Sequence, residues 1–167
     1  MFKTSKSKKI LGATLAAAFA LSVGGTVLAA DGDQLKKDRY EAETGSLKGI
    51  DIKVVPSTLA SGGKKVGWIN VPGKDGVTFT VKVTTAGEYI IEEGYDNGMG
   101  NAKHSIIVNG KKYIAKLPST GSWDDYAVSD GVRVSLNAGD NKVVVTANTA
   151  FAELDYIDVY LAPADSE

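Results

Sequence analysis

Cysteine is missing from this 167-residue chain, and histidine occurs once. Without cysteine the chain forms no disulfides, so an extracellular domain of this sequence depends on its apolar core, with a bound metal as the other available support. A single histidine leaves few bases for a nucleophile–base pair. No G-x-S-x-G elbow, phosphate-binding loop or His-rich metal motif occurs either. The sequence therefore argues against the common hydrolytic and phosphate-binding machineries.

A helical pattern is also missing. After position 30, no stretch of ten or more residues repeats its apolar positions with a period of 3.6. Instead, short runs alternate between apolar and polar residues, over 77–83, 88–93, 105–109, 131–136, 142–147 and 155–161. Period-two alternation rich in β-branched and aromatic residues is typical of half-buried strands. We therefore expect eight or nine short strands and an all-β domain.

Turn residues separate these runs. Asn109-Gly110 lies between two strand-like runs and predicts a tight hairpin, because both residue types tolerate positive φ. Strands of this length and spacing favour a jelly-roll β-sandwich of two antiparallel sheets. About 137 residues follow position 30, which is enough for one core and too few for two domains.

The longest uncharged run lies at the N-terminus. Four lysines come first, Ile10 to Val23 carries no charge, and Val27-Leu28-Ala29 offers aliphatic and small residues for a peptidase. This layout predicts a secretory signal peptide over residues 1–30. The apolar run is shorter than the roughly 20 residues of a membrane span, and no cysteine follows it to carry a lipid. We expect a secreted bacterial protein with no membrane insertion after cleavage.

Cleavage would remove four lysines and no acid. The remaining chain then has 15 basic and 20 acidic residues, a net charge of −5. A mildly acidic domain with scattered charges offers no electrostatic case for nucleic acid or for anionic membranes. We expect a monomer with a disordered N-terminal tail over 31–38, a folded module over 39–162 and a C-terminal tail over 163–167.

Two acids near the start of the module, Glu41 and Glu43, form the first candidate site. On a strand they would share one face about 7 Å apart. A hard divalent cation would relieve their repulsion, since Ca²⁺ takes six to eight oxygen ligands. Spacing alone favours the alternative of two solvated acids. Asp155 lies in a core-like run, where an acid needs a partner because unpaired burial is costly.

Carboxylates are the remaining route to catalysis. Two acids facing each other across a cleft can cleave a glycosidic bond. Glu92 and Glu93 point to opposite faces of a strand, so they do not pair. Asp124 and Asp125 lie in a loop beside Trp123 and are better placed, although loop acids are usually solvated. For the only histidine, His104, we expect a surface or half-buried role.

A series of short motifs covers the module from about residue 40 to residue 161. They are Tyr40-Glu41-Ala42-Glu43, the run 60–69, Ala86-Gly87-Glu88-Tyr89, Gly94-Tyr95-Asp96-Asn97, Val108-Asn109-Gly110, Thr120-Gly121-Ser122-Trp123, the run 136–141 and Leu154-Asp155-Tyr156-Ile157. In this order and spacing the chain resembles the calcium-containing β-sandwich carbohydrate-binding modules of families 6 and 35, and family 35 is the nearer of the two.

The resemblance implies a structural Ca²⁺, and it reverses the preference for solvated acids. The ligands it implies are the side chains of Glu41, Glu43 and Asp155, with main-chain oxygens of Asp155 and of the turn 63–65 around Lys64. It also implies a sugar site in the loops at one end of the sandwich, where Trp123 stacks on a pyranose face. The helpers we expect are Trp68, Tyr95, Asn97, Asn148 and Glu153, with Tyr126 and Asn70 as weaker candidates.

One position departs from the family pattern. The family often has an asparagine directly before the Leu-Asp pair, whereas this chain has Glu153 there. Glu153 would repel a uronic acid unless calcium bridged the two. We therefore expect a non-catalytic module that binds a polysaccharide or oligosaccharide of unspecified sugar. The alternatives are a protein-binding or cell-envelope structural module on the same sandwich and, less favoured, a small glycan-cleaving enzyme.

Overall fold

The computed structural model describes residues 35–164, so the predicted signal peptide over 1–30 lies outside the described residues. Within this range, twelve strands form two antiparallel sheets, and two short 3-10 helices accompany them. The predicted all-β jelly-roll sandwich is confirmed. No helix among the described residues has the length and apolar character needed to cross a membrane.

The larger sheet has the strand order β10-β6-β12-β4-β3, with β1 paired to β12 and β9 paired to β6. Its strands are β1 (Asp38–Glu41), β3 (Lys53–Pro56), β4 (Lys64–Gly67), β6 (Gly87–Asp96), β9 (Tyr126–Val128), β10 (Val132–Leu136) and β12 (Glu153–Leu161). Helix η1 (Ala42–Thr44) follows β1, and helix η2 (Ser61–Gly63) precedes β4.

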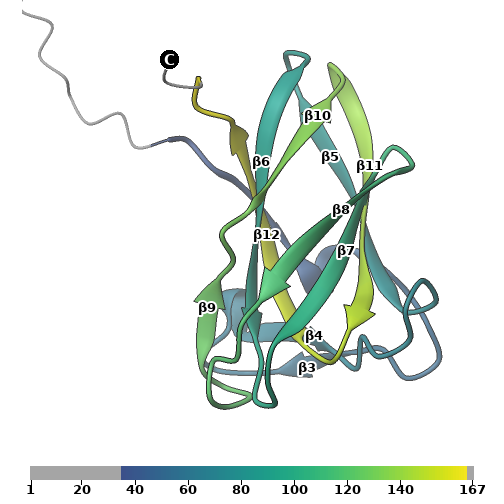
Figure 1. Cartoon of the computed structure of the whole chain (residues 1–167), viewed down its shortest axis with the longest axis vertical. Helices are drawn as coiled ribbons and strands as arrows, with labels where there is room; N and C mark the ends of the chain where they lie inside the picture. The colour runs from purple at the N-terminus through teal and green to yellow at the C-terminus, as the bar shows by residue number, and fades with distance from the viewer. Residues whose placement is uncertain (1–34, 165–167) are drawn as a thin grey trace, which may run out of the picture. The chain divides into compact units, whose positions relative to one another are not determined.

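The smaller sheet has the strand order β2-β5-β11-β7-β8. Its strands are β2 (Ser46–Lys48), β5 (Gly76–Val83), β7 (Ala102–Val108), β8 (Lys111–Leu117) and β11 (Gly139–Thr149). Figure 1 shows β5, β7, β8 and β11 as one layer and β6, β10 and β12 as the other, with β3, β4 and β9 at one end.

All six runs predicted as strands do form strands, with small shifts at their ends. The predicted hairpin is confirmed between β7 and β8, where Asn109 and Gly110 have φ values of 48° and 91° and Val108 pairs with Lys111. The strand count was underestimated. The additional strands include segments of three or four residues, β1, β2, β3, β4 and β9, which are too short to display a period.

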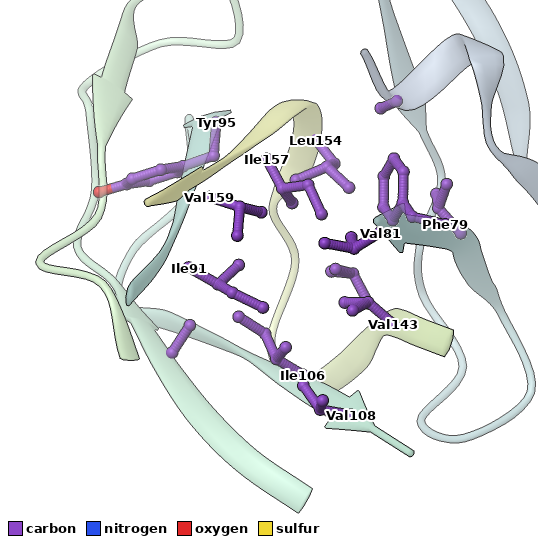
Figure 2. Packing of buried hydrophobic residues seen from close by; sticks show 14 of the residues in the cluster. Phe79, Val81, Ile91, Tyr95, Ile106, Val108, Val143, Leu154, Ile157 and Val159 are labelled. Atoms are coloured by element: carbon purple, nitrogen blue, oxygen red, sulfur yellow. The ribbon is translucent and has the colours of Figure 1, made fainter. Parts of the chain in front are cut away.

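Alternate residues of the long strands fill the space between the sheets. Val81, Ile106 and Val143 from one sheet and Ile91 and Ile157 from the other are fully buried, and Figure 2 shows these side chains meeting. Burying such side chains contributes about 1.5–3 kcal/mol each. This core supports the loops at the end of the sandwich.

The folded part begins slightly earlier than predicted. The N-terminal tail was expected to extend to residue 38, but Asp38 already pairs with Val159 in β1. Lys37 forms an ion pair with Glu92, and its ammonium lies 4.7 Å from the centre of the Tyr160 ring. These contacts fix the last two residues of the predicted tail against β6 and β12.

One ionisable pair is buried between the two sheets. Nδ1 of His104 on β7 lies 2.6 Å from Oε2 of Glu93 on β6, and neither side chain is more than 1% exposed. The expectation of a surface or half-buried histidine is therefore wrong, because the side chain of His104 points into the sandwich. The remaining polar atoms of the two side chains, Oε1 of Glu93 and Nε2 of His104, have no hydrogen-bond partner among the described residues. Each group therefore depends on the other.

We expect His104→Leu to lower the free energy of unfolding by about 3–5 kcal/mol, because it leaves the buried Glu93 carboxyl without its partner. The double variant Glu93→Leu/His104→Leu should cost less, since it removes both polar groups together. Urea unfolding of the three proteins measures this. A double variant less stable than His104→Leu alone would contradict the dependence of Glu93 on His104.

Candidate functional site

Loops at one end of the sandwich enclose a groove of about 530 Å³. The groove is lined by ten residues: Val55, Pro56, Lys65, Trp68, Asn70, Trp123, Asp124, Phe151, Ala152 and Glu153. Its three aromatic side chains are partly exposed, at 41% for Trp68, 37% for Trp123 and 41% for Phe151. A groove with several exposed aromatic faces and a few polar groups is typical of a ligand-binding site.

The backbone is strained beside two of these aromatic rings. Trp68 has a φ of 59°, and Ala150, directly before Phe151, has a φ of 56°. Among the described non-glycine residues only Asn109 of the hairpin shares this region. A left-handed conformation is unfavourable for a bulky residue such as tryptophan, and such strain concentrates at functional sites. The left-handed conformation of Trp68 ends β4 and directs the chain into the groove wall.

The third ring, Trp123, rests on a glycine-rich loop. A Cβ atom added to Gly98 would lie 3.0 Å from the indole Cδ1 and Nε1 of Trp123, so a larger residue there would push the indole outward. Asn97 organises that loop. Its amide donates to the carbonyl of Leu117 at 3.0 Å, and its Oδ1 accepts from the main-chain N–H groups of Met99 and Gly100. Asn97 thus fixes the loop against which the indole packs.

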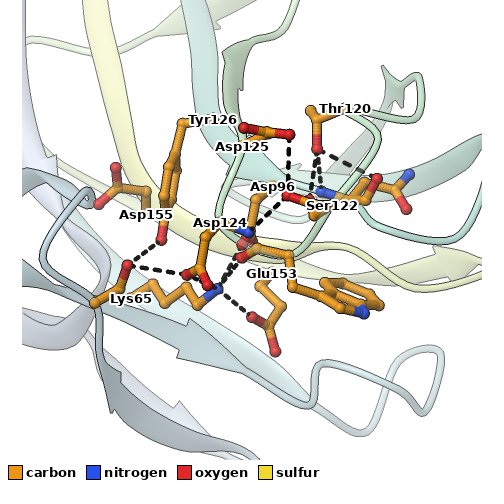
Figure 3. Close-up of polar contacts among 12 residues, drawn as sticks. Lys65, Asp96, Thr120, Ser122, Asp124, Asp125, Tyr126, Glu153 and Asp155 are labelled. Atoms are coloured by element: carbon orange, nitrogen blue, oxygen red, sulfur yellow. Dashed lines mark hydrogen bonds and ion pairs between the residues drawn. The ribbon is translucent and has the colours of Figure 1, made fainter.

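A buried lysine forms the floor of the groove. Nζ of Lys65 donates to the Asp96 carboxylate, to the main-chain oxygen of Trp123 and, at 2.8 Å, to Glu153, while Asp124 lies at 3.7 Å. Figure 3 shows the ammonium surrounded by these carboxylates. Burial lowers the pKa of Lys65, but the hydrogen bonds to Asp96 and Glu153 outweigh it and raise the pKa above its usual value. Lys65 therefore stays charged and fixes the Trp123 loop.

The structure brings some of the predicted sugar-site residues together. Trp123, Trp68, Glu153 and the weaker candidate Asn70 all line the groove. Gly67 allows Glu153 to approach, since a Cβ atom there would lie 2.6 Å from its Oε1.

Other predicted residues lie outside the groove lining. Tyr95 and Asn97 are buried, and the Tyr95 hydroxyl donates to the carbonyl of Pro118 at 3.0 Å. The Asn148 amide on β11 donates to Ser105 Oγ on the neighbouring strand β7, and the Tyr126 hydroxyl donates to Ser57 Oγ at 2.8 Å. These four residues therefore do not form part of the groove surface.

Phe151 was missed by the sequence analysis. It lies in the connection between β11 and β12, where no alternating pattern draws attention to it. The available signal was a large aromatic residue in a short connection between two strands, a place where exposed side chains often serve binding.

A second cluster of polar groups lies at the η2 turn. Oδ2 of Asp155 accepts from the Ser61 main-chain N–H at 3.0 Å, and Oε1 of Glu41 accepts from Ser61 Oγ at 2.7 Å. Oε1 of Glu43 lies 3.0 Å from the position of a Cβ atom on Gly62. Glu43 belongs to η1 and not to a strand, so the expectation that it shares a strand face with Glu41 is wrong. The two carboxylates nevertheless converge on the same turn.

Each of these three acids keeps one buried oxygen without a partner among the described residues: Glu41 Oε2, Glu43 Oε2 and Asp155 Oδ1. Burial raises the pKa of Asp155 to about 6, the Ser61 N–H opposes that shift, and the charges of Glu41 and Glu43 add to it. Asp155 reaches the turn from a β-bulge, because the pairing of β12 with β6 shifts between Leu154 and Tyr156.

The side chains alone do not complete a metal site. Among residues 35–164, no group of three or more His, Asp or Glu side chains is arranged to hold a metal by itself. A cation bound between Glu41, Glu43 and Asp155 would need further oxygens, and the main chain around Gly63 and Lys64 lies in the same turn. The orphaned carboxylate oxygens and the raised pKa of Asp155 fit such a ligand.

Known proteins are similar to this chain in sequence and in fold. A 1,6-alpha-glucosyltransferase of Sporosarcina globispora is 35% identical over 136 residues, which cover 75% of this chain and 10% of that enzyme. A family 35 carbohydrate binding module from Clostridium thermocellum superimposes with a TM-score of 0.67 at 29% identity, covering 74% of this chain and 98% of that one.

The cycloalternan-forming enzyme from Listeria monocytogenes, solved with a pentasaccharide substrate, gives a TM-score of 0.67 at 29% identity. The match covers 73% of this chain and 12% of that enzyme. The chain thus spans about a tenth of the length of these two enzymes. The family model described as carbohydrate binding module (family 35) matches residues 38–162. The chain therefore belongs to family 35 of the carbohydrate-binding modules.

Proposed function

We propose that the groove binds a carbohydrate and does not cleave it. The observation that carries this proposal is the presence of three partly exposed aromatic rings, Trp68, Trp123 and Phe151, around one groove. The axial C–H faces of a pyranose are apolar and pack on aromatic rings, whereas its hydroxyl rim needs hydrogen-bond partners. Asn70, Asp124 and Glu153 supply such partners in the same lining.

The charge of the groove favours a neutral sugar. Asp124 and Glu153 line it, and the Lys65 ammonium between them is already bonded to the buried Asp96. Lys53 lies over the outer wall, 4.1 Å from the centre of the Trp68 ring. The acids outnumber the free cations, so a uronic acid would meet repulsion that a neutral sugar avoids.

We take an α-1,6-linked glucan as the first ligand to test, because a relative is named for 1,6-α-glucosyl transfer. The N-terminal sequence pattern supports a role outside the cell, where such polymers are encountered. A protein-binding role for the same surface is the second candidate, since exposed aromatic residues also occur at protein interfaces.

We also propose that a structural Ca²⁺ binds at the η2 turn. Glu41, Glu43 and Asp155 would hold it through side chains, with main-chain oxygens of Asp155 and of the Lys64 turn. The three orphaned oxygens support this, since a hard cation prefers oxygen ligands. When bound, the ion would supply two positive charges that offset most of the negative charge of the three neighbouring acids.

We expect Trp123→Ala to weaken binding of a soluble α-1,6-glucan by roughly 30-fold, because loss of the stacking face removes about 2 kcal/mol of apolar burial. Affinity electrophoresis measures this. The matched control is Leu161→Ala, which removes an apolar side chain of 59% exposure away from the groove lining.

Unchanged glucan affinity in Trp123→Ala would contradict the groove assignment and favour the protein-binding alternative. Release of reducing ends from the same glucan by the unmodified chain would contradict the non-catalytic part of the proposal. The two results are independent, because stacking and cleavage are measured separately.

The calcium proposal predicts a specific pH dependence. The pKa of Asp155 in the metal-free fold is about 6, above the ordinary 3.8. This group therefore stabilises the metal-free fold most below pH 3.8, and the contribution is lost as the pH rises through 6. Calcium instead needs the ionised carboxylate. We expect Ca²⁺ affinity to fall about tenfold from pH 7 to pH 5.

Thermal unfolding in Ca²⁺ and in EDTA checks this prediction. The Tm difference between the two conditions should be large at pH 7 and shrink towards pH 5. Asp155→Asn should abolish the difference, whereas Asp125→Asn, which changes a loop acid bonded to Ser122, should preserve it. A Tm that responds to neither Ca²⁺ nor EDTA at pH 7 would refute the site.

A further inference from the structure

The outer face of the five-stranded sheet carries charge of almost one sign. Its strands alternate between buried residues and residues that point outward. The outward positions include six lysines, Lys48, Lys82, Lys103, Lys112, Lys116 and Lys142, and one acid, Asp140. Asp140 pairs in register with Lys82 at one end. We call this surface the lysine face.

The lysines of this face repel one another and are not in ion pairs with acids. Lys103 and Lys116 lie directly opposite each other on β7 and β8, a cross-strand arrangement that is destabilising for like charges. Among the described residues, none of the six lysines forms an ion pair. Their positive charge is therefore available to a partner.

The face is also hollowed and partly apolar. A depression of about 150 Å³ is lined by Lys48, Lys74 and Lys142 together with the aliphatic side chains of Ile107 and Val144. Asp75 lies in the same lining, but it is buried. Its carboxylate accepts from the main-chain N–H groups of Asn70 and Val71 at 3.2 and 2.8 Å. Within residues 35–164, Asp75 forms no ion pair with the lysines around the depression.

We infer that the lysine face is a second binding surface, which takes a linear polysaccharide that carries carboxylates. Mobile ammonium groups suit anions spaced along a chain, and Ile107, Val144 and Ile114 offer apolar surface to the C–H faces of its sugars. Single-stranded nucleic acid is bound largely by stacking on aromatic rings, and no outward position of these strands is aromatic. The inference is independent of the groove, which the other sheet and its loops form.

The test is affinity electrophoresis of the chain in gels that contain polygalacturonate. We expect clear retardation that weakens with added salt. Lys103→Gln/Lys112→Gln/Lys142→Gln should lower the affinity at least about tenfold. The matched control Lys36→Gln/Lys37→Gln/Arg133→Gln loses the same charge away from this face and should keep the affinity. The first triple variant should also be no less stable, because it relieves the repulsion between Lys103 and Lys116.

A neutral α-1,6-glucan gel separates this inference from the proposed groove function. Trp123→Ala should affect retention only in the glucan gel, and the lysine-face variant only in the polygalacturonate gel. The inference is overturned if polygalacturonate does not retard the chain or if both triple variants lose affinity equally. Binding of single-stranded DNA as tight as that of polygalacturonate would also overturn it, since the surface would then select charge and not sugar.

Discussion

The buried ammonium group of Lys65 is the interaction on which the groove depends. It comes from β4 and bonds to Asp96 at the end of β6, to Glu153 at the start of β12 and to the carbonyl of Trp123. Its side chain is 5% exposed, so its charge must be compensated within the protein. These bonds set the floor of the groove and the position of one aromatic wall together. The groove is therefore largely formed in the free protein, which lowers the conformational cost of binding.

The N-terminal edge of the sandwich is held without disulfides. β1 has only four residues, and a ladder this short gives little stability by itself. Arg39 reinforces it with two hydrogen bonds to Asp158 on β12, at 2.8 and 2.7 Å. Its guanidinium also lies 3.4 Å from the centre of the Tyr156 ring. Beside these contacts, the charges of Glu41 and Glu43 act on Asp155. The same edge therefore holds both a well-bonded ion pair and a group of acids with unpartnered oxygens.

The sequence predicted the regular parts of the fold and two walls of the groove. Long alternating strands and the Asn109-Gly110 turn follow from local rules, because period two and positive φ are properties of neighbouring residues. Asn97 was expected to help bind the sugar, but it is buried, and only the folded contacts show that its amide bonds to Leu117 and Gly100. Phe151 and the network around Lys65 join segments far apart in the chain, and no local pattern predicts such contacts.

The amino-acid composition does not reveal how charge is distributed over the surface of the folded domain. Along the sequence the lysines of residues 82–142 look scattered, and the chain as a whole is slightly acidic. Because successive side chains of a strand point to opposite faces, residues two apart lie on the same face. The antiparallel register then brings Lys103 opposite Lys116. The acids of the groove lie in loops and on the other sheet. A net charge that argues against acidic partners for the whole domain therefore does not apply to this face, because a polymer responds to local potential within about 10 Å at 0.1 M salt.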